Sequence, residues 1–171
     1  MKPITAAVVT VSDKGYAGER EDASGPLLAD LLCSMGAEVV SQTIVPDEVA
    51  DIERVLTTLA DETRVDLVMT TGGTGATPRD VTPEATGAVI EREMPGLAEA
   101  LRFEGYRKTP LAVLSRGVAG IRGRTLIVNL PGSPKAVREG METLGPILPH
   151  AIRMLRGVDT EHRHAKGAYH A

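Results

Sequence analysis

The residues most able to do chemistry in this chain lie at positions 70–86, in the sequence T-T-G-G-T-G-A-T-P-R-D-V-T-P-E-A-T. Glycine lets backbone N–H groups turn towards a ligand, because φ > 0 costs it little and no Cβ blocks the approach. Opposite charges follow at Arg79 and Asp80. Such a loop suits a phosphate and its metal ion, although a tight strand-to-helix turn without a ligand would use similar residues. Its glycines fall within four positions: Gly72, Gly73 and Gly75.

A second stretch that could bind an anion, N-L-P-G-S-P-K, covers residues 129–135. Ser133 is a favourable N-cap and Pro134 suits the first helical position, so we predict that a helix begins here. The free N–H groups at a helix N-terminus attract anions, and Lys135 would reinforce that attraction. The alternative is a well-capped helix start with an exposed lysine.

Three aspartates follow predicted strands: Asp13, Asp47 and Asp80. Ligands bind at the carboxyl ends of the strands in open α/β sheets, and consecutive strands commonly lie near one another, so we expect these carboxylates to meet. Asp47 has a simpler alternative role as the N-cap of the next helix. Carboxylates repel phosphates, and a bridging Mg²⁺ would resolve the conflict. The residues alone therefore indicate a Mg²⁺-dependent phosphoryl or nucleotidyl transfer, which depends on positioning and charge neutralisation.

Several other kinds of site are missing from the sequence. It has no G-x-x-x-x-G-K-[ST], no G-x-G-x-x-G after a strand, no Cys–His or Ser–His–Asp constellation and no zinc-ligand cluster. With 2% aromatic residues and a net charge of −4, the chain also lacks the features of a nucleic-acid-binding protein. Positions 102–124 nevertheless hold a basic cluster, which suits an anionic small molecule, a solvated face or a subunit contact. Its members are Arg102, Arg107, Lys108, Arg116, Arg122 and Arg124.

Apolar runs alternate with helical patterns along the chain, which predicts an α/β fold with a mainly parallel sheet. Ile4–Val11 is almost continuously apolar, as expected for a strand covered on both faces. Two further runs around Gly123 predict one antiparallel hairpin. The other predicted strands are Ala37–Val45 and 65–69, and predicted helices include 83–93, 97–107 and 136–156 with a break near Gly145.

The chain reads as one domain over residues 1–157, followed by a flexible tail at 158–171. Cys33 is the single cysteine, so no intrachain disulfide can form, which fits a reducing compartment. We find no signal peptide and no apolar run of membrane length, and expect a cytoplasmic protein without a membrane partner. We interpret the tail as a frayed terminus and not as a metal site, despite its three histidines: His162, His164 and His170.

The sequence resembles the molybdenum-cofactor biosynthesis family typified by MogA and MoaB. The central loop at 70–86 and N-L-P-G-S-P-K carry the likeness, together with V-S-D at 11–13, P-D-E at 46–48 and L-S-R at 114–116. The resemblance implies a three-layer α/β/α sandwich that forms trimers, to which the apolar arm Thr125–Leu130 could contribute a subunit contact. It also implies molybdopterin adenylyltransferase activity, in which AMP passes from ATP to the terminal phosphate of molybdopterin with Mg²⁺ and pyrophosphate leaves.

The resemblance also assigns roles to individual residues. Asp47 and Asp80 match the two catalytic aspartates, which would hold Mg²⁺. The phosphate and substrate loop corresponds to Gly72, Gly73, Thr74 and Gly75. The remaining pocket walls correspond to Ser12, Asp13, Ser115, Arg116, Pro131, Gly132 and Ser133.

Two alternatives remain open within this family. A MoaB-like protein could be a pterin-binding or carrier module that does not adenylylate. In either case the family implies a hand-off to the molybdate-inserting enzyme. Pyrophosphate release in the presence of ATP, Mg²⁺ and molybdopterin separates the catalytic from the carrier alternative.

Overall fold

The computed structural model describes residues 2–158, which form a six-stranded sheet of order β2-β1-β3-β6-β5-β4. The strands β2, β1, β3 and β6 are parallel, whereas β5 pairs antiparallel with both β6 and β4. This arrangement confirms the predicted mainly parallel sheet with its antiparallel hairpin. The strands are β1 (Ile4–Val11), β2 (Ala37–Val45), β3 (Leu67–Thr71), β4 (Arg92–Glu93), β5 (Ala119–Arg122) and β6 (Thr125–Leu130).

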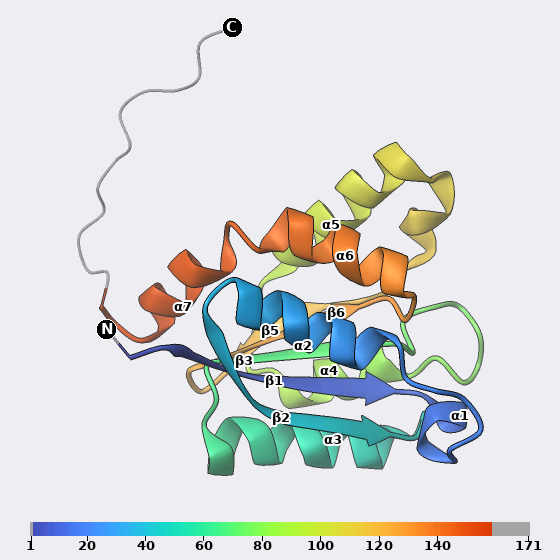
Figure 1. The fold of residues 1–171 in the computed structure, drawn as a ribbon, viewed down its shortest axis with the longest axis horizontal. Coiled ribbons are helices and arrows are strands. Elements are labelled where there is room, and N and C mark those ends of the chain that lie inside the picture. Colours follow the sequence, from blue (N-terminus) through green and yellow to red (C-terminus); the bar gives the residue numbers. More distant parts are fainter. Residues whose placement is uncertain (1, 159–171) are drawn as a thin grey trace, which may run out of the picture.

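Helices cover both faces of the sheet, which confirms the three-layer α/β/α sandwich (Figure 1). In β1, Ala6 and Val8 pack into one hydrophobic core, while Ala7, Val9 and Val11 pack into the other. One core is completed by α2 (Ser24–Ser34), α5 (Pro95–Lys108), α6 (Pro134–Leu144) and α7 (Leu148–Leu155). The other is completed by α3 (Val49–Thr57), η1 (Thr58–Thr63) and α4 (Thr82–Val89). The short elements α1 (Asp13–Tyr16) and η2 (Pro110–Leu114) lie outside these two layers.

Pairing within the sheet shifts two of the predicted element boundaries. The strand predicted at 65–69 runs instead from Leu67 to Thr71, because Thr70 and Thr71 are paired on both sides, with β1 and β6. The helix predicted at 83–93 ends at Val89, because the edge strand Arg92–Glu93 pairs with β5. In both places, pairing with neighbouring strands places in the sheet residues that the local sequence pattern assigned to a loop or a helix.

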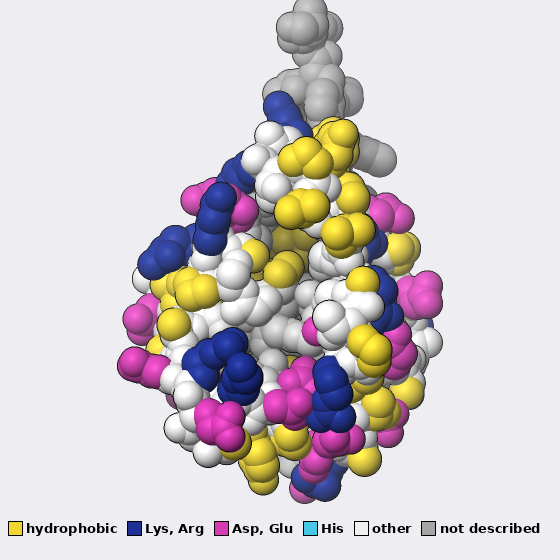
Figure 2. Space-filling model, turned by 90° about the vertical axis from the view of Figure 1, so that its right-hand side faces the viewer, with side chains coloured by type: hydrophobic (Ala, Val, Ile, Leu, Met, Phe, Trp, Pro, Cys, Tyr) yellow, Lys and Arg dark blue, Asp and Glu magenta, His cyan; other side chains and the backbone are white. Residues whose placement is uncertain are grey.

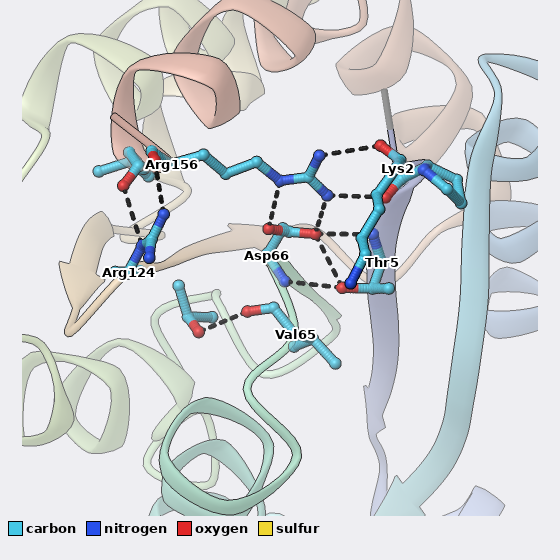
Figure 3. A network of polar contacts seen from close by, with 9 residues as sticks. Lys2, Thr5, Val65, Asp66, Arg124 and Arg156 are labelled. Atoms are coloured by element: carbon cyan, nitrogen blue, oxygen red, sulfur yellow. Dashed lines mark hydrogen bonds and ion pairs between the residues drawn. The ribbon is translucent and has the colours of Figure 1, made fainter. Parts of the chain in front are cut away.

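Arg156, which follows α7, forms a polar network near the beginning of β1 and β3 (Figure 3). Its guanidinium pairs with Asp66 at 2.6 Å and donates to the carbonyl oxygens of Lys2 and Pro3. Asp66 also accepts the N–H and the hydroxyl of Thr5, each at 2.8 Å. Burial opposes ionisation of Asp66, but the guanidinium and the Thr5 donors outweigh it and hold the pKa of Asp66 below its ordinary value. This network joins the residue that follows α7 to β1 and to the residue that precedes β3.

The tail predicted at 158–171 lies outside the described residues except for Val158, as do its three histidines. Within residues 2–158, no helix is both long and apolar enough to cross a membrane. The same residues contain no group of three or more His, Cys, Asp or Glu side chains placed to hold a metal ion.

Candidate active site

The predicted site residues meet at the carboxyl edge of the parallel strands, where the surface is hollowed (Figure 2). One cavity of about 530 Å³ lies between the glycine loop, α5, η2 and α6, and a second of about 510 Å³ lies between the loop, β1 and the start of α6. They share Gly73, Asp80 and Gly132. The first is also lined by Thr74, Gly75, Ser115 and Pro131, and the second by Ser12, Asp47, Gly72 and Ser133.

Two glycines of the central loop are required by backbone conformation. Gly72 and Gly73 have φ of 102° and 65°, in the left-handed region that favours glycine. A Cβ at Gly72 would overlap the carbonyl oxygen of Val11, and one at Gly73 would overlap the hydroxyl of Thr82. Thr82 holds the loop, since its hydroxyl donates to Gly72 O at 2.9 Å and its N–H to Gly73 O at 3.1 Å. The turn and the close packing against β1 and α4 therefore both fix this backbone.

The third glycine serves a different purpose, because Gly75 does not have a positive φ. A Cβ there would lie 2.8 Å from Oδ2 of Asp80, so the missing side chain admits this carboxylate. Asp80 Oδ2 also accepts the N–H and the hydroxyl of Thr77, at 2.9 and 2.6 Å. The Thr77 hydroxyl, with the N–H groups of Thr77 and Gly75, holds the pKa of Asp80 below its ordinary value. Asp80 is thus a fixed, ionised group between the two cavities.

Asp47 is fixed by a reciprocal pair of hydrogen bonds with Asp13. The Asp13 N–H donates to Asp47 Oδ2 at 2.8 Å, and the Asp47 N–H donates to Asp13 Oδ1 at 2.9 Å. The helix-cap alternative for Asp47 is wrong, since α3 begins with Glu48 as N-cap and has no side-chain cap. Asp13 lines neither cavity, so it orients Asp47 instead of forming a wall.

The two members of this pair have different electrostatic environments. Burial raises the pKa of Asp47, the Asp13 N–H opposes this increase, and the negative charges of Asp13 and Asp80 add to it. The Asp47 N–H, together with the Arg79 guanidinium, holds the pKa of Asp13 below its ordinary value. Arg79 bridges Asp13 and Glu48, each at 2.9 Å, and so extends the support of Asp47. A bound cation would therefore favour the ionised form of Asp47.

Arg116 is predicted as a wall of the pocket, but in the structure it lines neither cavity. Its guanidinium donates to the carbonyl oxygens of Gly75 and Asp80, at 2.7 and 2.6 Å, and pairs with Glu84. The backbone N–H of Arg116 donates to Thr74 O at 2.8 Å. Arg116 therefore binds both ends of the loop segment that carries Asp80.

Each member of the basic cluster at 102–124 contacts protein groups, and two members, Arg102 and Lys108, also line the first cavity. Arg102 donates to Gly117 O at 2.8 Å, and Arg122 pairs with Asp61 at 2.7 Å. Arg124 donates to Arg156 O at 2.6 Å. The remaining pairs are Arg107 with Glu104, Lys108 with Glu142, and Arg116 with Glu84.

The second predicted stretch packs directly against the glycine loop. A Cβ at Gly132 would lie 3.2 Å from Gly72 Cα, and Gly72 N–H donates to Leu130 O at 3.1 Å. The predicted helix start is confirmed, since Ser133 Oγ accepts Ala136 N–H at 3.1 Å. Lys135 is exposed and lines neither cavity.

Sequence reasoning missed Asn129 as a lining residue of the first cavity. Its buried amide donates to the hydroxyls of Thr70 and Thr86, each at 3.0 Å, and accepts Val118 N–H at 3.1 Å. An amide within the apolar strand T-L-I-V-N-L was the available signal. Asn129 thus joins β3, α4 and the residue that precedes β5.

Comparison with known proteins agrees with this arrangement. Residues 7–150 match the family described as the probable molybdopterin binding domain. Molybdopterin adenylyltransferase of Helicobacter pylori strain J99 is 40% identical over 159 residues, covering 92% of this chain and 90% of that protein. The molybdenum cofactor synthesis protein cinnamon of Drosophila melanogaster is 44% identical over 91% of this chain, which spans only 26% of that longer protein.

A solved structure extends the likeness to the fold. The molybdopterin biosynthesis enzyme MoaB of Thermus thermophilus superposes with a TM-score of 0.86 at 52% identity, covering 90% of this chain and 97% of that one. The family match covers most of the chain, and the fold of the solved relative matches as well. The chain therefore belongs to the probable molybdopterin-binding domain family.

Proposed function

We propose that this protein is a molybdopterin adenylyltransferase, which transfers AMP from ATP to the terminal phosphate of molybdopterin and releases pyrophosphate. One observation carries the proposal: Asp47 and Asp80, on separate loops, both line a cavity that shares lining residues of the glycine loop with an adjacent cavity. The Helicobacter pylori relative of the same name supports it at 40% identity over nearly its whole length.

The two adjacent cavities suit a reaction between two phosphate-bearing molecules. At about 530 and 510 Å³, each has the volume of a typical small-molecule site. Reacting phosphates that meet near Gly73, Asp80 and Gly132 would lie beside the loop backbone. Holding two reactants in this way converts a bimolecular step into one within a single complex.

The carboxylates at this junction fit a Mg²⁺ ion. Mg²⁺ is commonly bound through one or two carboxylates together with substrate phosphates and water, so a three-residue cluster is not required. Asp47 and Asp80 would hold it, and both line the second cavity. When bound, the ion would neutralise charge on the triphosphate.

The chain's own residues supply orientation. Asp13 and Arg79 hold Asp47, while Thr77, Gly75 and Arg116 hold the loop that carries Asp80. A phosphate nucleophile is ionised at neutral pH and needs no strong general base. Accordingly, no histidine is among the described residues that line the two cavities.

We further propose that residues 1–157 form one domain that assembles as a cytoplasmic homotrimer and hands its product to the molybdate-inserting enzyme. The arm Thr125–Leu130 cannot supply the subunit contact considered above, because all six of its residues are buried within the fold. An exposed apolar surface is available on α5 and η2 instead, where Figure 2 shows hydrophobic side chains beside the hollow. Light scattering should report about three times 18.1 kDa.

The test of the proposed activity is direct. Pyrophosphate should be released when the protein is mixed with ATP, Mg²⁺ and molybdopterin, and each omission should abolish release. Binding of molybdopterin without pyrophosphate release would instead support the carrier alternative.

A further inference from the structure

Arg20 lines the second cavity and is the one cationic side chain among the described residues that do so. It lies on the segment between α1 and α2, where its N–H and that of Glu19 both donate to Lys14 O, at 3.2 and 2.9 Å. The backbone that carries Arg20 is therefore anchored, while the side chain is exposed.

The other arginines near this edge are already engaged by the protein. Arg79 pairs with Asp13 and Glu48, and Arg116 pairs with Glu84 and the loop carbonyls. Within residues 2–158, by contrast, the Arg20 side chain forms no hydrogen bond or ion pair. Its guanidinium is thus available to a ligand.

Within residues 2–158, none of the four carboxylates that line the second cavity forms an ion pair with Arg20; they are Glu21, Asp22, Asp47 and Asp80. Asp22, two residues away, is already occupied by donors of the protein, because it accepts the Thr10 hydroxyl at 2.6 Å and the Gly25 N–H at 2.9 Å. Asp47 is engaged with Asp13 N–H, and Asp80 with Thr77. A cation at the rim of a cavity that also contains these carboxylates matches an anionic ligand that enters with a counter-ion.

We propose that Arg20 binds phosphate oxygens of the substrate that occupies the second cavity. The guanidinium presents a planar set of donors that matches phosphate, and charge-assisted bonds of this kind are among the stronger hydrogen bonds. The phosphate belongs either to the triphosphate of ATP or to the terminal phosphate of molybdopterin. The identification of these two substrates rests on the proposed function, whereas the contact between guanidinium and phosphate rests on the cavity alone.

Calorimetric titration of the full chain tests this proposal, with Mg²⁺–ATP, Mg²⁺–pyrophosphate and molybdopterin as separate ligands. Arg20→Ala should weaken at least one of them by about tenfold or more, and the ligand affected identifies the source of the phosphate. Arg20→Lys keeps the charge but loses the planar donors, so it should recover only part of the affinity. Because the Arg20 side chain forms no hydrogen bond or ion pair within residues 2–158, neither variant should change the melting temperature.

Lys14 provides the matched control, because it is a neighbouring exposed cation that lines neither cavity. Lys14→Ala should change each affinity by less than about twofold, since exposed charges are screened. Wild-type affinity of Arg20→Ala for all three ligands would overturn the proposal, as would an equal loss in Lys14→Ala.

Failure of this proposal can be told apart from failure of the proposed function. If the wild-type protein releases pyrophosphate and Arg20→Ala keeps both KM values, the Arg20 contact is refuted and the activity stands. If the wild-type protein releases none but Arg20→Ala loses affinity for pyrophosphate, the phosphate contact stands and the activity is refuted.

Discussion

Asp80 places its carboxylate where a side chain at Gly75 would begin. An ideal Cβ at Gly75 lies 2.8 Å from Asp80 Oδ2, and the Gly75 backbone is not in the left-handed region. The glycine is therefore explained by the close approach of a carboxylate and not by the turn. Gly72 and Gly73, in the same loop, combine a positive φ with their own close contacts.

Gly75→Ala should separate positioning from folding. The added methyl group would displace the Asp80 carboxylate, so we predict a folded protein whose pyrophosphate release falls about tenfold or more. Gly87→Ala is the control, because Gly87 lies in α4 with open space around its Cβ position. That variant should keep its activity and gain about 0.5–1 kcal/mol of stability. Equal activity in the two variants would refute the positioning role of Gly75.

Asp13 should affect the rate of adenylyl transfer because it orients Asp47. Asp13→Asn retains an oxygen that can accept the Asp47 N–H, whereas Asp13→Ala loses both this hydrogen bond and the ion pair with Arg79. We predict that kcat falls further in Asp13→Ala than in Asp13→Asn, by about tenfold. Steady-state kinetics of the two variants decide the matter. Equal rates would show that the hydrogen bond does not orient Asp47.

The Asp66–Arg156 network should contribute to stability and not to catalysis. The pKa of Asp66 is lowered in the folded protein, so its stabilisation is present above the unfolded value of about 3.9 and is lost as pH falls through the folded value. At pH 7, Asp66→Asn should lower the free energy of unfolding by about 1–3 kcal/mol. Urea titrations should show this difference shrinking below about pH 4 while pyrophosphate release at pH 7 stays normal. A difference that is independent of pH would contradict this account.

Much of the architecture follows from pattern in the sequence. Continuous apolar runs such as Ile4–Val11 indicated strands covered on both faces, and the structure confirms two cores that share this strand. The carboxyl-edge rule correctly brought Asp47 and Asp80 to one cavity. Ser133 was correctly predicted as an N-cap, because that role depends on a hydrogen bond three residues away.

Side-chain partners could not be predicted in the same way. Arg116 and Asp13 belong to recognisable motifs, yet in the structure they hold other residues of the site in place and do not line a cavity. Their partners lie 32 or more residues away in the sequence, so the motifs did not reveal these contacts. The extension of β3 through Thr70 and Thr71 depends on pairing with β1 and β6. Such tertiary contacts leave no local periodicity in the sequence.

Pyrophosphate release by wild type, Asp47→Asn and Asp80→Asn tests the central claim most directly, with ATP, Mg²⁺ and molybdopterin all present. Both substitutions preserve shape and remove one negative charge, so the melting temperature should change little. We predict activity in the wild-type protein and a loss of about a hundredfold or more in each variant, which is about 2.7 kcal/mol of the barrier. No release by the wild-type protein, or near-normal turnover in either variant, would contradict the assignment of adenylyl transfer to this pair of carboxylates.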